Sequence, residues 1–213
     1  MSDATFASAV QALRAAFPVV ATVTGPHRFR EYVALYRSPY PYDGSPQYGD
    51  EFAEFLDVMQ VEDMPYLPEL AQLEWLVHCA RQADDVPTID AATLSAIPTE
   101  KFGETRLALH PSAGLQQAGY PVARLWEIHQ PGFAGQPTVE AVIVRNYILV
   151  NRPGTHVEVS TIDEGGYAFL NAIARGATLG EACALARAAK ADFDLAEALQ
   201  DAAARRLLCT AAG

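Results

Sequence analysis

The sequence has few of the residues that mark disulfide-bonded, zinc-binding or nucleic-acid-binding proteins. Its three cysteines, Cys79, Cys183 and Cys209, stand far apart and in no paired spacing, which indicates neither a disulfide framework nor a zinc site. Lysine and arginine total 15 against 26 aspartates and glutamates, giving a formal net charge of −11. Proteins that bind nucleic acid normally neutralise phosphates with many cations, so this balance disfavours nucleic acid as a partner.

Other signatures are missing too. No apolar run reaches the ~20 residues needed to cross a bilayer, and the N-terminus has no basic stretch followed by an apolar one, so we expect a cytoplasmic protein without a membrane partner. The glycine-rich phosphate-binding loops are absent, and Ser112 has no Gly-x-Ser-x-Gly setting. Glu74 and His78 have the spacing of half a metal site, but no complementary pair accompanies them, and we interpret them as a helix-flank pair.

The negative charge is concentrated in the first half of the chain. Residues 1–103 contain 15 acidic and 6 basic residues, whereas the remainder contains 11 and 9. A charged module joined to a nearly neutral one, without a cluster of reactive side chains, indicates an adapter or carrier rather than an enzyme. We therefore expect no cofactor on this chain.

The first half has the periodicity of helices. Apolar residues three and four positions apart predict helices over 4–16, from about Thr24 to Tyr36, over 52–59 and over 64–79. The proline-rich segment 38–46 predicts a loop, because proline removes backbone donors and restricts the preceding residue. Together these segments predict an acidic helical bundle over residues 1–87.

The second half has strand and helix signals. After a linker at 88–104, we expect four strands, at 106–111, 121–128, 141–150 and 156–161, with the last two forming a hairpin. Three helices should follow, the first capped by Asp163, the second by a capping box of Thr178 and Glu181, and the third by Asp192 or Asp194. Residues 205–209 are predicted to return as a final strand.

The predicted fold class is therefore α+β, with an N-terminal helical bundle followed by a winged-helix-like domain over 105–213. Winged-helix units place a helix in a DNA groove or present a sheet edge to a peptide. The helix expected at 178–190 carries only Arg187 and Lys190 as cations, which favours the peptide. A DNA-binding regulator and a metal-dependent enzyme remain the alternatives.

The chain also resembles a known family over roughly residues 6–208. The residues that carry the resemblance are Phe17-Pro18-Val19-Val20, Phe29 with Tyr32, Tyr36, Tyr40 and Pro41, Phe52 with Phe55 and Leu56, Tyr66 to Trp75, Leu109-His110-Pro111-Ser112, Tyr120 to Trp126, Arg145, and Phe169 to Ala182. In these the chain is similar to the partner proteins of multinuclear non-haem iron oxygenases, the HvfC/BufC type, whose N-terminal domain has long been labelled DNA-binding.

The resemblance implies an accessory subunit without catalytic residues, which binds a ribosomally made precursor peptide and a multinuclear non-haem iron oxygenase. The iron would lie on the oxygenase, and this chain would hold no metal.

Two sets of contact residues follow from our strand and loop predictions. The expected peptide-binding residues are Val142, Val144, Arg145, Tyr147, Leu149, Val157, Val159, Arg175 and Arg187, with the arginines suited to acidic residues of a leader. The expected oxygenase-binding residues are Tyr36, Tyr40, Tyr42 and Tyr48, since tyrosine is enriched at protein contacts.

Overall fold

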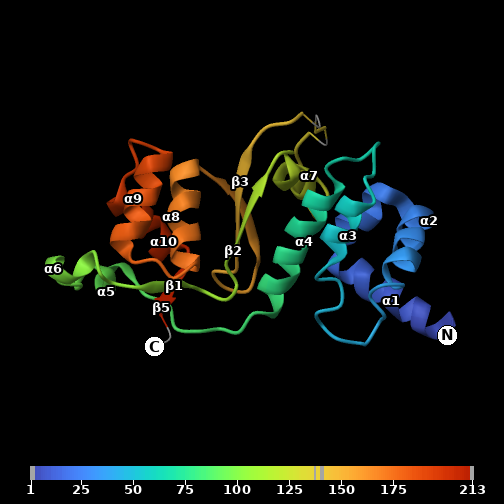
Figure 1. Ribbon diagram of the computed structural model, residues 1–213, viewed down its shortest axis with the longest axis horizontal. Helices are drawn as coiled ribbons and strands as arrows, with labels where there is room; N and C mark the ends of the chain where they lie inside the picture. The colour runs from blue at the N-terminus through green and yellow to red at the C-terminus, as the bar shows by residue number, and fades with distance from the viewer. Residues whose placement is uncertain (1–2, 137, 140–141, 212–213) are drawn as a thin grey trace. The chain divides into compact units, whose positions relative to one another are not determined.

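The computed structural model describes residues 3–136, 138–139 and 142–211. The chain is mixed helix and sheet, which confirms the α+β class (Figure 1). It divides into two compact units, one formed by Met1–His78 with Ala118–Arg145 and the other by Cys79–Gln117 with Asn146–Gly213. The units therefore differ from the division expected at residues 88–104, because each one is assembled from two separate stretches of chain.

The first unit is built from helices. They are α1 (Asp3–Ala16), α2 (Pro18–Tyr36), α3 (Phe52–Val58), most of α4 (Leu67–Gln82) and α7 (Val122–Ile128). Aromatic rings fill much of its core: Phe17 and Phe52 have ring centroids 4.8 Å apart, and Tyr36 packs edge-on against Phe52 at 5.2 Å. Rings of this size dominate the burial of apolar surface, so the aromatic residues of the first half stabilise this unit.

The helix α2 begins earlier than the sequence predicts. The sequence predicts one helix over 4–16 and the next from about Thr24. Instead α2 runs from Pro18 and is kinked at Gly25, whose φ of 76° is in the left-handed region. Pro18 stands at the first position of the helix, where its missing N–H costs nothing. Gly25 permits the kink without steric strain, and Pro26 continues the helix from there.

The second unit contains the strands. In one pair, β1 (Leu107–Leu109) lies antiparallel to β5 (Leu208–Thr210). A separate sheet has the order β2-β3-β4, with β2 at Gly114–Ala118, β3 at Asn146–Asn151 and β4 at Glu158–Ile162. Strands β3 and β4 pair antiparallel from Tyr147↔Ile162 to Asn151↔Glu158, which confirms the predicted hairpin.

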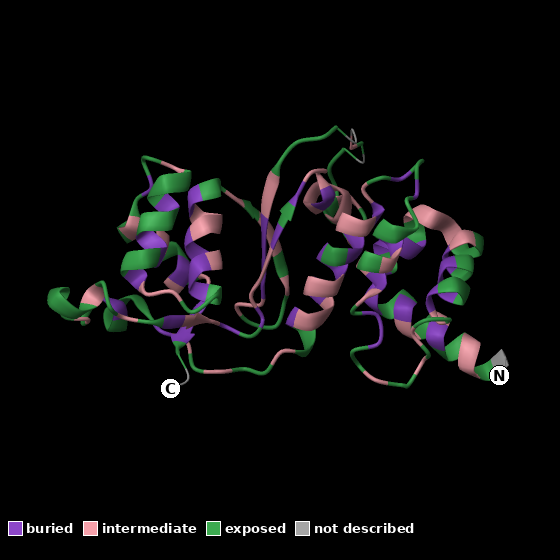
Figure 2. Cartoon of the chain, in the orientation of Figure 1, coloured by how far each residue is buried: buried purple, intermediate pink, exposed green. Residues whose placement is uncertain are grey.

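Three capped helices follow the hairpin. Asp163 accepts a hydrogen bond from the Gly166 N–H at the start of α8 (Glu164–Ala174). Thr178 and Glu181 form the predicted capping box of α9 (Leu179–Ala189), and Asp194 caps α10 (Leu195–Ala204). Because these caps join residues close in sequence, local patterns were sufficient to predict them. Each of the three helices carries both buried and exposed residues (Figure 2).

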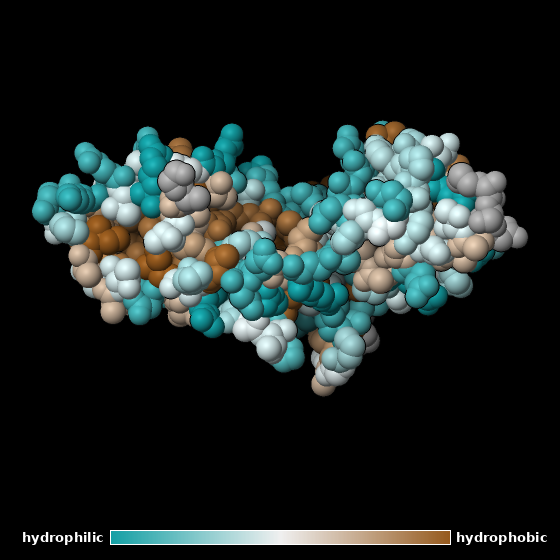
Figure 3. Space-filling model, turned by 90° about the horizontal axis from the view of Figure 1, so that it is seen from below, coloured by the Kyte–Doolittle hydropathy of each residue, from teal (hydrophilic) through white to brown (hydrophobic). Residues whose placement is uncertain are grey.

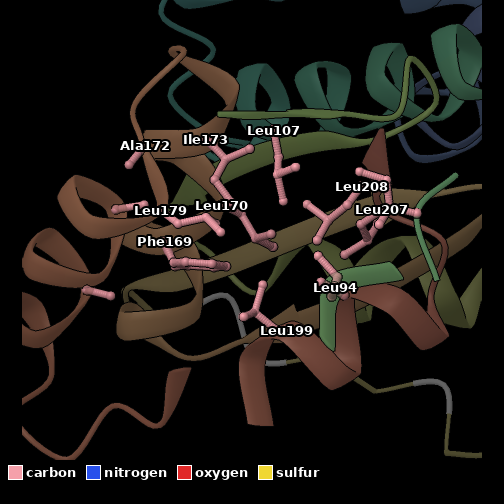
Figure 4. Packing of buried hydrophobic residues seen from close by; sticks show 14 of the residues in the cluster. Leu94, Leu107, Phe169, Leu170, Ala172, Ile173, Leu179, Leu199, Leu207 and Leu208 are labelled. Atoms are coloured by element: carbon pink, nitrogen blue, oxygen red, sulfur yellow. The ribbon is translucent and has the colours of Figure 1, made fainter. Parts of the chain in front are cut away.

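The core of the second unit joins these helices to both sheets. Leu170 and Ile173 of α8, Leu179 of α9 and Leu199 of α10 belong to one buried cluster (Figure 4). The same cluster includes Leu107 of β1 and Leu208 of β5.

The predicted linker also belongs to this unit. Residues 88–104 contain two short helices, α5 (Ala91–Ser95) and α6 (Thr99–Phe102). Ile89 and Leu94 are buried in the hydrophobic cluster, and the Ile89 N–H donates to the Leu208 carbonyl at 2.8 Å. The segment is therefore part of a folded core.

Several strand predictions are wrong in whole or in part. Residues 121–128, predicted as a strand, form α7: Val122, Leu125 and Trp126 follow the helical period, which outweighs their β propensity. The strand predicted at 141–150 is β3 from Asn146 only; Ala141 lies outside the described residues. Val144 instead donates its N–H to the Gly119 carbonyl at 2.8 Å. The strand predicted at 156–161 is β4, shifted to 158–162, which leaves Val157 outside it.

Candidate functional site

The hairpin and its turn place four of the expected peptide-binding residues in the second unit. Leu149 is fully buried in the core, so its side chain is not available to a ligand. Tyr147 is half-buried, and its hydroxyl donates to Glu164 Oε1 at 2.6 Å. Val159 is half-buried on β4, and Val157 is half-buried just before that strand.

The other expected peptide-binding residues do not join them. Val142, Val144 and Arg145 are exposed, lie outside β3 and cluster with the first unit. Arg175 follows the C-terminal end of α8, roughly 16 Å of helix away from the end that β4 leads into. Arg187 lies in the last turn of α9 and lines a different cleft. These arginines therefore do not form a groove with the hairpin strands. Their positions depend on tertiary packing, which the strand patterns of the sequence do not predict.

A groove does lie beside β4, on different residues. It has a volume of about 310 Å³ and runs between the C-terminal end of β4 and α10. Both apolar and charged residues line it. Its polar lining includes Thr161, Asp163, Lys190, Glu197, Asp201 and Arg205.

Arg205, the residue that follows α10, links this helix to β4. Its Nη1 donates to Ser160 Oγ at 2.9 Å, while its Nε donates to Asp201 Oδ1 at 2.8 Å. Asp201 and Arg205 are four residues apart and therefore lie on one face of the helix. This spacing can be read from the sequence. The neighbouring residues, however, do not indicate that this face of α10 is directed toward β4.

The groove has an excess of carboxylates. Asp163, Asp192, Asp194, Glu197 and Asp201 line it, against Lys190 and Arg205. Lys190 Nζ lies 2.8 Å from Asp163 Oδ2, and this hydrogen bond lowers the pKa of Asp163 and raises that of Lys190. Asp163 is therefore ionised at neutral pH, and the five carboxylates outnumber the two cations of the groove.

Strand β4, whose last two residues line this groove, lies at the edge of its sheet. In the sheet order β2-β3-β4, strand β4 comes last, and within the described ranges it pairs with β3 alone. The side chains of Glu158 and Thr161 on β4 are exposed. An edge strand of this kind has backbone groups directed away from its partner, which can pair with another extended chain.

A larger cleft of about 930 Å³ lies between the α5–α6 segment and the turn that joins α9 to α10. Leu94, Phe102, Phe193 and Leu195 contribute apolar surface to it, and Arg187 lies at its margin. Hydrophobic residues, drawn brown, are visible at the surface of the second unit in Figure 3.

The four tyrosines expected at a partner interface are divided by the structure. Tyr36 is fully buried and Tyr48 is 8% exposed, whereas Tyr40 and Tyr42 are half-buried. Burial raises the pKa of Tyr36 and of Tyr48 above the usual tyrosine value, so both stay neutral. Only Tyr40 and Tyr42 have exposed ring surface that a partner can contact, because Tyr36 and Tyr48 are part of the aromatic core.

An apolar patch lies elsewhere on the first unit. Leu35, Val58 and Met59 are 50%, 76% and 41% exposed, which is unusual for side chains of this size. Leu35 and Met59 line a cleft of about 730 Å³, bounded on one side by the Arg28–Asp63 ion pair. The sequence does not reveal these exposed side chains, because their exposure depends on how the helices pack.

Glu74 and His78 have separate partners. Glu74 is 1% exposed, and its carboxylate accepts hydrogen bonds from the Val19 and Val20 N–H groups at the start of α2. His78 stacks on Trp75 with ring centroids 5.0 Å apart. Among the residues described, no group of three or more His, Cys, Asp or Glu side chains is placed to hold a metal ion.

Ser112 and His110 form a buried hydrogen-bonded pair. Their Oγ and Nδ1 atoms are 2.8 Å apart, and the Arg152 N–H also donates to Ser112 Oγ. Burial lowers the pKa of His110, with the charge of Arg152 acting in the same direction. Since Ser112 is 3% exposed and His110 6% exposed, the pair connects loops in the interior of the unit.

Comparison with known proteins gave no relative: no protein-family model matches the chain, and neither does any curated protein sequence. In the part of the chain that the structure describes, no helix is both long and apolar enough to cross a membrane.

Proposed function

We propose that this chain is a non-catalytic accessory subunit that binds a ribosomally made precursor peptide and presents it to a multinuclear non-haem iron oxygenase. The observation that carries the proposal is the open edge of β4 beside the groove under α10. In this account the chain holds no cofactor, and the iron lies on the oxygenase. The resemblance of the sequence to such partner proteins supports the same function.

In this proposal the second unit is a winged-helix-like peptide-recognition domain. The order of a strand hairpin followed by three short helices supports that description. The peptide would lie along β4 as an added strand, with main-chain hydrogen bonds providing affinity and the groove selecting side chains. Apolar as well as charged residues line the groove, which suits the alternating side chains of an extended chain.

The contribution to the reaction is proximity. A peptide held at β4 is delivered to the oxygenase at a high effective concentration, so the holder needs no reactive group of its own. The peptide's reacting end would extend beyond the groove. This division of labour agrees with the burial of the Ser112–His110 pair, which has no access to a substrate.

The first unit, which we propose to be a helical bundle, would dock the oxygenase. Tyr40 and Tyr42 have exposed surface on the proline-rich loop, and Leu35, Val58 and Met59 form the apolar patch. Partly exposed aromatic and apolar side chains of this kind are typical of protein interfaces.

Recovery of partners from native cells tests the function. The tagged protein is purified with and without nuclease, and the bound proteins and peptides are identified by mass spectrometry, with an untagged strain as the control. We expect a non-haem iron enzyme and a short peptide, insensitive to nuclease. Recovery of DNA-associated proteins that nuclease removes would contradict the proposal and favour a DNA-binding regulator.

A further inference from the structure

We infer that the peptide bound at the β4 groove is basic and carries two cationic side chains separated by one residue. The inference rests on the proposed function and names the substrate class of that site. It reverses the acidic leader expected from the sequence, because the arginines behind that expectation are not in the groove.

The contacts at its two ends indicate the direction of α10 along the groove. At one end, Arg205 contacts Ser160 in the middle of β4 at 2.9 Å. At the other end, Glu197 lines the groove together with Lys190, which is bonded to Asp163 just after β4. A path along β4 toward Asp163 therefore passes Arg205, then Asp201, then Glu197.

The spacing of these carboxylates matches an extended chain. Glu197 and Asp201 are four residues apart on α10, which corresponds to about 6 Å of helix rise. Side chains on one face of a strand repeat every second residue, or about 6.7 Å. A strand added along β4 therefore brings two side chains, separated by one residue, opposite Asp201 and Glu197.

The charges favour cations at those two positions. Both carboxylates are exposed, and no ion pair within 4.0 Å is seen for Glu197 among the described residues. Asp201 bonds Arg205 through Oδ1 alone, which leaves Oδ2 for a second donor. With five carboxylates and two cations lining the groove, acidic peptide side chains would be repelled.

Matched peptides test the inference on the full chain. The probes are fluorescein-labelled peptides of about eight residues that alternate Thr and Val and carry Lys-x-Lys, Glu-x-Glu or Gln-x-Gln at their centre. Binding is followed by fluorescence anisotropy at low and at moderate salt. The protein variants are Glu197→Lys, Asp201→Lys and the control Glu104→Lys, an exposed residue of the same unit outside the groove.

We expect the Lys-x-Lys peptide to bind most tightly and to weaken as salt is added. Each groove variant should weaken it by about threefold to tenfold, and Glu104→Lys should leave it unchanged. Equal or tighter binding of the Glu-x-Glu peptide would overturn the inference that the peptide is basic. It would leave intact the proposal that β4 binds a peptide. If Glu104→Lys weakens binding as much as the groove variants, the assignment to the groove is wrong. Failure of the proposed function itself is seen separately, as the absence of any peptide recovered from native cells.

Discussion

Glu74 is the side chain whose role differs most from its appearance in the sequence. It is 1% exposed and accepts three hydrogen bonds from two N–H groups at the start of α2, at 2.8 to 3.1 Å. A negative charge there also complements the positive end of the helix dipole. The carboxylate therefore joins two helices that are far apart in sequence.

Substitution of this carboxylate should destabilise the first unit. We expect Glu74→Ala to cost about 2–4 kcal/mol, because it leaves two buried N–H groups without an acceptor. Urea denaturation followed by circular dichroism measures the cost, with Glu54→Ala, an exposed position on α3, as the control. A loss of stability no larger than that of Glu54→Ala would show that the hydrogen bonds of Glu74 do not stabilise the protein.

His110 makes the stability of the second unit depend on pH. Burial lowers its pKa in the folded state below the ordinary value of 6.5, and Arg152 and Arg206 act in the same direction while Asp85 opposes them. The unfolded chain then binds more protons near pH 6 than the folded chain does. Stability is full above about pH 6.5 and is lost as the pH falls toward the folded-state pKa.

The variant His110→Gln should remove part of this dependence. We expect the unfolding free energy of the native protein to fall more steeply than that of His110→Gln between about pH 7 and pH 5. Parallel curves for the two proteins would contradict this role. His156, which is exposed, provides the control through His156→Gln.

Among the elements, α9 contains a close approach that its sequence does not reveal. The Gly180 N–H donates to the Gly103 carbonyl at 3.0 Å, and a Cβ at Gly180 would lie 2.9 Å from that oxygen. Alanine is normally the better helix former, by about 1 kcal/mol. Here the clash is with backbone, which cannot move aside as a flexible side chain can.

The variant Gly180→Ala should therefore destabilise the protein by about 1–3 kcal/mol despite its helix propensity. Thermal unfolding measures the change. Gly154→Ala, at a site where no atom lies within 4 Å of the added Cβ, is the control and should be nearly neutral. An increase in stability for Gly180→Ala would show that α9 and residue 103 are not in contact.

The elements that local patterns predicted are those whose signals lie within a few residues. The capping box of α9 and the caps of α8 and α10 are of this kind. The start of α7 is different: the Glu69 carboxylate binds the Gly119 and Tyr120 N–H groups across 50 residues of chain. The groove beside β4 was missed for the same reason, because α10 reaches it only through tertiary packing.

For the whole molecule, the bounds of the two units predict which fragments of the chain are stable. Ile89 and Leu94 are buried in the core of the second unit, although the sequence placed them in a linker. We expect a fragment of residues 105–213 to be much less stable than one of residues 79–213, since each lost side chain contributes about 1.5–3 kcal/mol of burial. Urea denaturation of both fragments measures this, and equal stability would contradict the observed core.

The distribution of charge over the whole molecule indicates which kinds of partner it can bind. The groove beside β4 is lined mostly by carboxylates, and the first 103 residues carry most of the negative charge. This pattern agrees with a basic peptide held by one unit and an oxygenase bound by the other, and it disfavours phosphate contacts.

Photo-crosslinking from β4 tests the central claim most directly. A photoreactive amino acid replaces Thr161, an exposed residue on β4, and a second protein carries it at Glu104 as the control. After irradiation in native cells, the account predicts a short ribosomal peptide linked to position 161 and none at position 104. Crosslinks from position 161 to DNA or to large proteins only, without a peptide, would contradict it.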